Sequence, residues 1–150
     1  MRVAANVKYD KFPDFGEGMF QHSDRVMSVA WNAAGTHLAT GCDDNFARIF
    51  DVVRGLEIQK FQHSGGVNCV AWNAAGTQLA TGCDDKFARV FDVDRGHEIR
   101  KLEHSGWWIN SVAWNTAGTQ LATGSEDEYA RVFDVAGGHE ILKVVPSLNS

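Results

Sequence analysis

Three sets of histidine, threonine and aspartate recur along the chain and are the first candidates for chemistry. In each set the histidine precedes the threonine by 18 or 19 positions, and the aspartate follows the threonine by four. A histidine beside a hydroxyl and a carboxylate has the composition of a hydrolytic triad, in which the histidine is the general base. The sets are His22, Thr40 and Asp44; His63, Thr81 and Asp85; and His104, Thr123 and Asp127.

The threefold recurrence favours a structural role, because a single active site needs only one such set. The sequence therefore predicts no catalytic residues. The glycines in "NAAGT" and "LATG" do not follow the order of a phosphate-binding loop. Cys42, Cys69 and Cys83 lack the CxxC spacing of a zinc site, and the third copy has Ser125 where the first two have Cys42 and Cys83. We expect no cofactor and no metal.

The sets belong to three near-identical copies of one segment. Trp31, Trp72 and Trp114 are separated by 41 and 42 residues, and residues 26–66 and 67–107 are identical at 30 of 41 positions. A period of about 40–45 residues is typical of β-propeller blades or of helical pairs of the HEAT type. The spacing alone leaves both architectures open.

The local sequence favours strands. "VNCVAW", "TQLATGC" and "FARVFDV" are short, rich in β-branched and aromatic residues, and separated by Gly and Asn/Asp turns. In the second copy we expect strands at 67–73, 77–83, 86–93 and 97–102. Apolar side chains on both faces of "FARVFDV" indicate sheets packed between other sheets. The predicted fold is all-β, with four-stranded antiparallel sheets stacked radially as propeller blades in a partial propeller or open arc.

The repeated motifs resemble those of the WD-repeat family of β-propellers. "FQHS" and "LEHS" stand where the family has a Gly-His pair, and "LATGCDD" and "LATGSED" resemble its second strand. The Trp-Asp that ends the third strand is replaced by Phe50-Asp51, Phe91-Asp92 and Phe133-Asp134.

The resemblance implies a hydrogen-bonded network in each blade. Family blades join His, Ser/Thr, Asp and Trp; phenylalanine has no indole N–H, so we expect only His, Thr and Asp to connect. We expect the aspartate to accept a hydrogen bond from the histidine, tying the loop before strand one to the turn between strands two and three. The pairs Asp43-Asp44, Asp84-Asp85 and Glu126-Asp127 could suggest a glycosidase, but one aspartate of each pair is then already engaged.

The repeat suggests four units: an incomplete preceding blade in 1–25, with strands at 4–10 and 15–21, then blades in 26–66, 67–107 and 108–150. The last unit includes a C-terminal tail. Closed propellers have four to eight blades, so three and a half cannot close alone. Two interpretations remain open: the chain is a segment of a longer protein, or copies associate into a ring.

The family resemblance implies that partners bind on one rim, formed by the loops from strand four to strand one and from strand two to strand three. We expect a non-catalytic scaffold that binds a protein or peptide there, a basic peptide first, because the rim is mostly acidic. The alternatives are a structural unit that self-assembles into a ring, as a homo-oligomer, and a regulatory segment of a longer protein. The candidate residues are Asp24, Arg25, Asp43, Asp84, Lys86, Trp107, Trp108, Glu126 and Glu128.

Trp107 and Trp108 have two interpretations, as anchors for a partner or as a cap on a seam between blades. The first residues of the inner strands, Val26, Val67 and Ile109, are expected to line a central channel. The net charge of −5 argues against a nucleic-acid partner. No apolar run approaches the ~20 residues of a membrane span, and Asn6 and Lys8 interrupt any secretory core. We therefore expect a cytoplasmic protein without a membrane partner.

Overall fold

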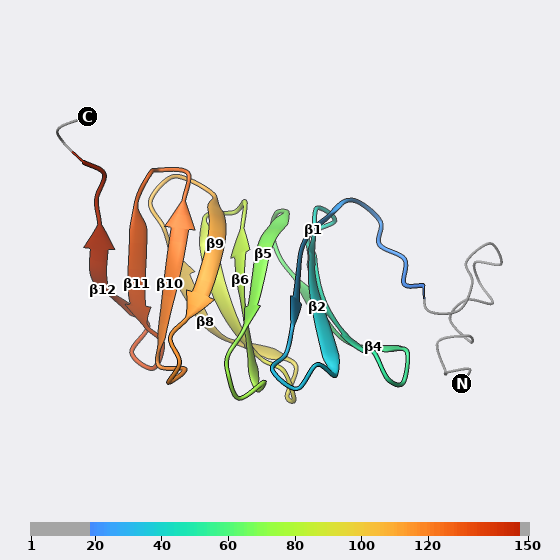
Figure 1. Ribbon diagram of the computed structural model, residues 1–150. Coiled ribbons are helices and arrows are strands. Elements are labelled where there is room, and N and C mark those ends of the chain that lie inside the picture. Colours follow the sequence, from blue (N-terminus) through green and yellow to red (C-terminus); the bar gives the residue numbers. More distant parts are fainter. Residues whose placement is uncertain (1–18, 148–150) are drawn as a thin grey trace.

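The computed structural model describes residues 19–147, which form three four-stranded antiparallel sheets in a row (Figure 1). Within each sheet every strand pairs with its neighbour in the sequence, and we call the sheets blades 1, 2 and 3. Blade 1 consists of β1 (Val26–Trp31), β2 (His37–Cys42), β3 (Phe46–Asp51) and β4 (Leu56–Gln62). Blade 2 consists of β5 (Val67–Trp72), β6 (Gln78–Cys83), β7 (Phe87–Asp92) and β8 (His97–Glu103). Blade 3 consists of β9 (Ile109–Trp114), β10 (Gln120–Ser125), β11 (Ala130–Asp134) and β12 (His139–Val144).

This architecture confirms the predicted all-β class and the propeller-blade sheets. Each strand of blade 2 ends within one residue of its expected position. The part of the chain that the structure describes contains no helix that is long and apolar enough to span a membrane. Of the preceding half-blade, residues 19–21 lie outside any strand. The expected strand at 4–10 and the start of the strand at 15–21 lie outside the described residues.

Polar side chains fix the turns between the first two strands of each blade. The Asn73 carboxamide oxygen accepts hydrogen bonds from the backbone N–H groups of Thr77 and Gln78, both at 3.0 Å. Gly76 completes this turn at a φ of 72°, a left-handed conformation that costs glycine little. The same capping recurs at Asn32 and Asn115. Because Asn73 caps the turn, β5 ends one residue earlier than expected.

The turns between the second and third strands hold a different residue in the left-handed region in each blade. Asn45, Lys86 and Glu128 have φ values of 77°, 78° and 75°. In blade 2 the preceding aspartate stabilises the turn, because the Asp85 carboxylate accepts from the N–H of Phe87 at 3.2 Å. Asparagine tolerates this conformation better than lysine or glutamate does, so the turns of blades 2 and 3 carry more backbone strain.

The apolar core lies in the two seams between blades. At the first seam Val67 packs onto Gly41, where an added Cβ would lie 2.9 Å from the Val67 Cγ1. At the second seam Ile109 packs onto Gly82, where an added Cβ would lie 2.7 Å from the Ile109 Cγ2. Both side chains are fully buried. The prediction that Val67 and Ile109 line a channel is therefore wrong: a small residue on the neighbouring strand leaves a socket, and burial there removes the apolar side chain from water.

Candidate functional site: a buried polar hub and an acidic rim

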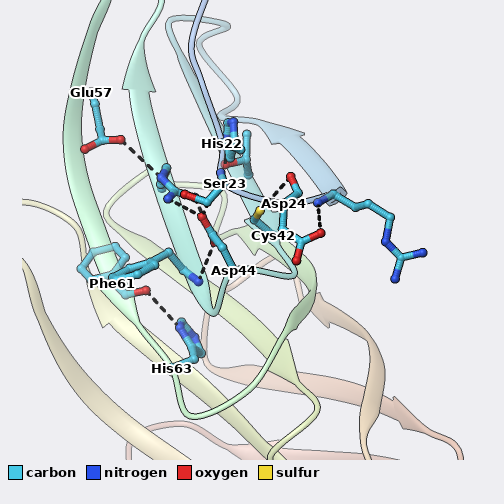
Figure 2. A network of polar contacts seen from close by, with 12 residues as sticks. His22, Ser23, Asp24, Cys42, Asp44, Glu57, Phe61 and His63 are labelled. Atoms are coloured by element: carbon cyan, nitrogen blue, oxygen red, sulfur yellow. Dashed lines mark hydrogen bonds and ion pairs between the residues drawn. The ribbon is translucent and has the colours of Figure 1, made fainter. Parts of the chain in front are cut away.

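Each blade contains a buried arginine held between two carboxylates. In blade 1, Arg48 on β3 donates to both oxygens of Asp44, at 3.2 and 2.5 Å, and its Nε lies 3.5 Å from Glu57 on β4. Asp44 also accepts from the backbone N–H of Ser23 at 3.4 Å. Figure 2 shows these contacts converging on Asp44, with Glu57 on the far side of the hub. The hub thus joins the loop before β1, the β2–β3 turn and β4.

The arginine held between two carboxylates recurs in the other blades. Arg89 binds both oxygens of Asp85 and lies 3.2 Å from Glu98, and Arg131 binds Asp127 at 3.3 and 2.5 Å and lies 3.3 Å from Glu140. All three arginines are buried. A buried guanidinium costs several kcal/mol in lost hydration unless it is paired, so the two carboxylates are a structural requirement.

The hub shifts the acidity of its aspartates. Burial alone would raise the pKa of Asp44, but the hydrogen bonds from Arg48 and Cys42 and the charge of Arg48 outweigh it and hold that pKa at about 2. Asp85 and Asp127 also have lowered pKa values, with Arg89 and Arg131 as the stabilising partners. These carboxylates are therefore ionised in the folded protein at every physiological pH.

The histidines form a separate link that crosses from one blade to the next. His63 follows β4 of blade 1, and its Nε2 lies 2.8 Å from the Thr81 hydroxyl on β6 of blade 2. The Nδ1 lies 3.1 Å from the Phe61 carbonyl, and the His63 backbone N–H donates to Asn45 in the blade 1 turn at 2.7 Å. His104 bonds Thr123 at 2.7 Å and His22 bonds Thr40 at 2.9 Å.

The expected hydrogen bond from histidine to aspartate is wrong. Both ring nitrogens of His63 have other partners, and the Asp85 carboxylate is held by Arg89. A carbonyl can only accept, so the neutral ring donates from Nδ1 and accepts the Thr81 hydroxyl proton at Nε2. A general base that activates a hydroxyl has a carboxylate at the other nitrogen; here a backbone carbonyl takes that place. The link also ends on β6 and does not reach the following turn.

Burial lowers the pKa of His63 to about 4, and the nearby charge of Arg89 acts in the same direction. Burial likewise lowers the pKa values of His22 and His104. The three cysteines are buried and free, and burial raises the pKa of Cys69 to about 12. None of these groups has the exposure or acidity of a reactive side chain.

The arginine of each hub was missed in the sequence, although a signal was present. A charged residue stands in the middle of the third strand of all three copies, in "FARIFD", "FARVFD" and "YARVFD". Arginine is rarely buried unless it is paired. An arginine in an apolar strand, four residues after an acidic turn, therefore indicates a buried pair with that turn.

The predicted rim residues lie on one edge of the row, but their charges are not equally available. Next to blade 1, Arg25 is paired with Asp43 at 2.7 Å. Asp24 accepts from the Arg25 backbone N–H at 2.8 Å. Next to blade 2, Asp84 accepts from the Asn68 side chain at 2.8 Å, and Lys86 occupies the strained turn. The first two blades thus offer a rim of mixed charge.

The blade 3 end of the rim is aromatic, acidic and hollowed. A cavity of about 420 Å³ is lined by Trp107, Glu126, Glu128 and Tyr129, together with Ser105, Asp127, Arg131 and Lys143. Trp107 and Trp108 are 48% and 41% exposed, with their rings edge to face at 5.7 Å. The loop is held through its backbone, because the Trp108 carbonyl accepts from Ser125 Oγ at 3.1 Å and from the Glu126 N–H at 3.2 Å.

Two carboxylates of this cavity are available to a ligand. Asp127 is engaged by Arg131, and the Lys143 ammonium lies 4.7 Å from the centre of the Tyr129 ring. Glu126 accepts one hydrogen bond, from Asn110 at 2.5 Å, and Glu128 makes no ion pair with any residue in 19–147. The cavity can therefore offer negative charge beside an exposed indole.

Comparison with known families gives one match, to the description "WD domain, G-beta repeat", over residues 17–51, 55–92 and 96–134. The second and third matched segments each contain the fourth strand of one blade and the first three strands of the next. The unit of sequence therefore straddles a seam. No protein with curated annotation matches the chain.

Proposed function

Because the chain belongs to the WD-repeat family, whose repeats generally serve as scaffolds for protein interactions, we propose that it is a non-catalytic scaffold that binds a Lys- or Arg-containing peptide on its rim. The binding site we assign is the cavity at blade 3, with Trp107 and Trp108 as the apolar anchor and Glu126 and Glu128 as the charged partners.

The observation that carries this proposal is the pairing of exposed indoles with available carboxylates. Exposed tryptophans are the side chains that most often dominate interface energies, at about 2 kcal/mol or more each. The aliphatic stem and charged head of lysine or arginine fit such a surface, because the indole face attracts a cation and the carboxylates neutralise it. Electrostatic attraction of this kind mainly accelerates association.

The arrangement of the polar groups supports a role without catalysis. His63 and His104 are buried and His22 is partly buried, each against a threonine hydroxyl, and the hub aspartates are neutralised by arginine. Within the described residues no group of three His, Cys, Asp or Glu side chains is placed to hold a metal. The acidic and aromatic groups that remain accessible are those of a binding surface.

The test is selection of a random 12-residue peptide library on the full chain, followed by titration of the enriched peptides by fluorescence anisotropy. We expect enrichment in Lys and Arg and binding that weakens as salt rises. The double variant Trp107→Ala/Trp108→Ala should weaken binding by about 30-fold or more, which corresponds to the loss of 2 kcal/mol. Enrichment without basic residues, or affinity that is indifferent to salt, contradicts the proposal.

Matched variants separate the site from general effects. Glu126→Gln/Glu128→Gln should weaken binding, whereas Asp94→Asn, in the β7–β8 turn at the opposite edge, should not. Trp31→Ala removes another exposed tryptophan away from the rim and should leave the peptide affinity unchanged. If Trp31→Ala weakens binding as much as the double tryptophan variant, the peptide binds elsewhere.

A further inference from the structure

The two outer surfaces of the row are the two halves of an internal seam. At each internal seam the earlier blade offers alanine and glycine beside larger apolar residues, and a carbonyl, and the later blade inserts valine, leucine and tryptophan side chains. The free surface of blade 1, which we call the inserting face, contains Val26, Val29, Trp31, Leu38 and Val52. The free surface of blade 3, which we call the receiving face, contains Ser111, Ala113, Ala122, Gly124, Val132, Leu142 and Val144.

The first internal seam shows how such faces fit together. The Trp72 indole N–H donates to the Ala30 carbonyl at 3.0 Å, and the Val70 backbone N–H donates to Ser28 Oγ at 3.1 Å. Trp72 packs against a cluster that includes Ala39 and Ile49. The second seam repeats the tryptophan contact, from Trp114 to the Ala71 carbonyl at 3.0 Å.

The outer faces carry the same residues in the same positions. Trp31 corresponds to Trp72, and Val26 corresponds to Val67 on the inserting side. Ala113 corresponds to Ala30, and Ser111 to Ser28, on the receiving side. Val67 is fully buried, whereas Val26 is 44% exposed. The outer faces therefore carry the residues of a seam but have no adjacent blade within residues 19–147.

The receiving face contains a hollow at the position where an internal seam holds its tryptophan. A cavity of about 200 Å³ is lined by Ala113, Ala122 and Val132, together with Trp114, Asn115 and Gln120. The first three correspond to Ala30, Ala39 and Ile49, the surroundings of Trp72. Trp31 is 56% exposed, so the side chain that fits the hollow is exposed on blade 1, at the other end of the row.

From these correspondences we propose that two copies of the chain associate head to tail into a closed ring of six blades. Trp31 of each copy enters the hollow of the other, with its indole N–H on the Ala113 carbonyl and the Val29 N–H on Ser111 Oγ. The blade count favours two copies: closed propellers have four to eight blades, and residues 19–147 form three blades, so that two copies give six. A head-to-tail contact that closes makes a ring, and one that does not close makes a filament.

Two positions on these faces differ from the internal seams in a way that fits the ring. Phe20 already lies against Phe50, with ring centres 4.3 Å apart and the planes tilted by 34°, near the position that Phe61 takes on Phe91, where the rings stack at 4.2 Å. The receiving face has Val144 where the internal seams have Phe61 and Leu102, and this smaller side chain leaves room beside Phe20. Leu142 replaces Gln59, which bonds the Val93 carbonyl; the new seam therefore has an apolar contact with Val52 in its place.

The first experiment is light scattering coupled to size exclusion on the full chain between about 1 and 100 µM. We expect a species of twice the 16.5 kDa chain mass that does not grow with concentration. A monomer over the whole range overturns the proposal, and so does a mass that rises steadily with concentration, because it indicates an open filament.

Variants then identify the faces. Trp31→Ala and Ala122→Arg should each weaken the dimer by about 30-fold or more, while circular dichroism and the melting temperature of the monomer stay unchanged. Trp107→Ala, at the rim, should leave the dimer intact. If Trp31→Ala weakens the dimer but Ala122→Arg does not, the dimer is a face-to-face pair of blade 1 surfaces. That result overturns the head-to-tail arrangement.

Mixing the two variants gives a result that only a head-to-tail ring produces. A mixed pair of a Trp31→Ala chain and an Ala122→Arg chain keeps one intact interface and places both substitutions in the other. Native mass spectrometry should detect the mixed pair in preference to either variant paired with itself. Failure of peptide binding leaves this result unaffected, because the rim and the two faces share no residue.

Discussion

Blades 2 and 3 have nearly the same sequence but very different surroundings. Leu102 on β8 is 2% exposed, whereas Val144 at the equivalent position on β12 is 53% exposed. Gly82 would clash with Cys69 and Ile109 if it carried a Cβ, whereas a Cβ on Gly124 would meet Ser111 at an ordinary 3.6 Å. The polar hubs of the two blades have the same partners.

The comparison separates two kinds of stabilisation. Contacts within a blade are specified by the repeat itself and recur in every copy. Contacts across a seam need a second blade, as expected for an array in which stability is a sum of internal and nearest-neighbour terms. Substitutions in the hub should therefore cost the same in both blades, and substitutions at the seam should not.

The largest effect should come from the hub. Arg89→Met and Arg131→Met each leave a largely but not fully buried aspartate without its cation, and each should lower the free energy of unfolding by about 3–5 kcal/mol. Urea titration measures both, with the exposed Arg95→Met as a control near zero. A much smaller loss for Arg131→Met than for Arg89→Met would show that the hub also depends on the seam.

Acid should weaken the seam link at His63. Its pKa is about 4 in the fold and near 6.5 when unfolded, so the unfolded chain binds the proton more readily. The contribution of His63 to the free energy of unfolding is therefore fully present above pH 6.5. It falls by about 3 kcal/mol as the pH drops toward 4. His63→Gln should remove most of this slope between pH 7 and 4. His22→Gln should remove less of the pH dependence, because His22 is only half-buried. Equal effects of the two variants would show that burial of the histidine does not set the size of the pH dependence.

The seam itself is tested with alanine at two equivalent glycines. Gly82→Ala must displace Cys69 or Ile109 and should cost about 1–3 kcal/mol. Gly124→Ala makes only an ordinary contact with Ser111, at 3.6 Å, in the single chain and should change its stability by less than about 0.5 kcal/mol. Thermal melts at low protein concentration measure both, and equal destabilisation would mean that Gly124 is already covered.

The smallest effect should come from the strained turns. Lys86→Asn and Glu128→Asn place the residue of the first copy in the left-handed position, and each should stabilise the protein by about 0.5–1 kcal/mol. The reciprocal Asn45→Lys serves as the control and should lose a similar amount. No gain in blade 3 would indicate that Glu128 makes a compensating contact in solution.

The sequence predicts the local structure of this protein well because the local signals are physical. Asparagine and glycine at the turns and β-branched residues between them place the strands of blade 2 to within one residue. The family resemblance supplied the histidine and threonine positions. It also suggested a histidine–aspartate bond that the structure replaces with an arginine–aspartate pair, because a motif names residues without giving the direction of each side chain.

Burial was harder to predict because it depends on the neighbour. Val26, Val67 and Ile109 look equivalent in the sequence and were all expected in a channel. In the structure Val67 and Ile109 are enclosed by the preceding blade, and Val26 is not. The exposure of Trp107 and Trp108 likewise depends on a loop held by its backbone, for which the sequence has no periodic signal.

The offset between the matched family segments and the sheets has a consequence for how such a chain changes in length. A genetic duplication of one segment, such as 55–92, would add the last strand of one sheet and the first three of the next. The product would gain one complete seam along with the new sheet. The inserting and receiving faces at the two ends of the row would keep their residues. Growth by whole segments therefore preserves every type of contact that the fold already uses.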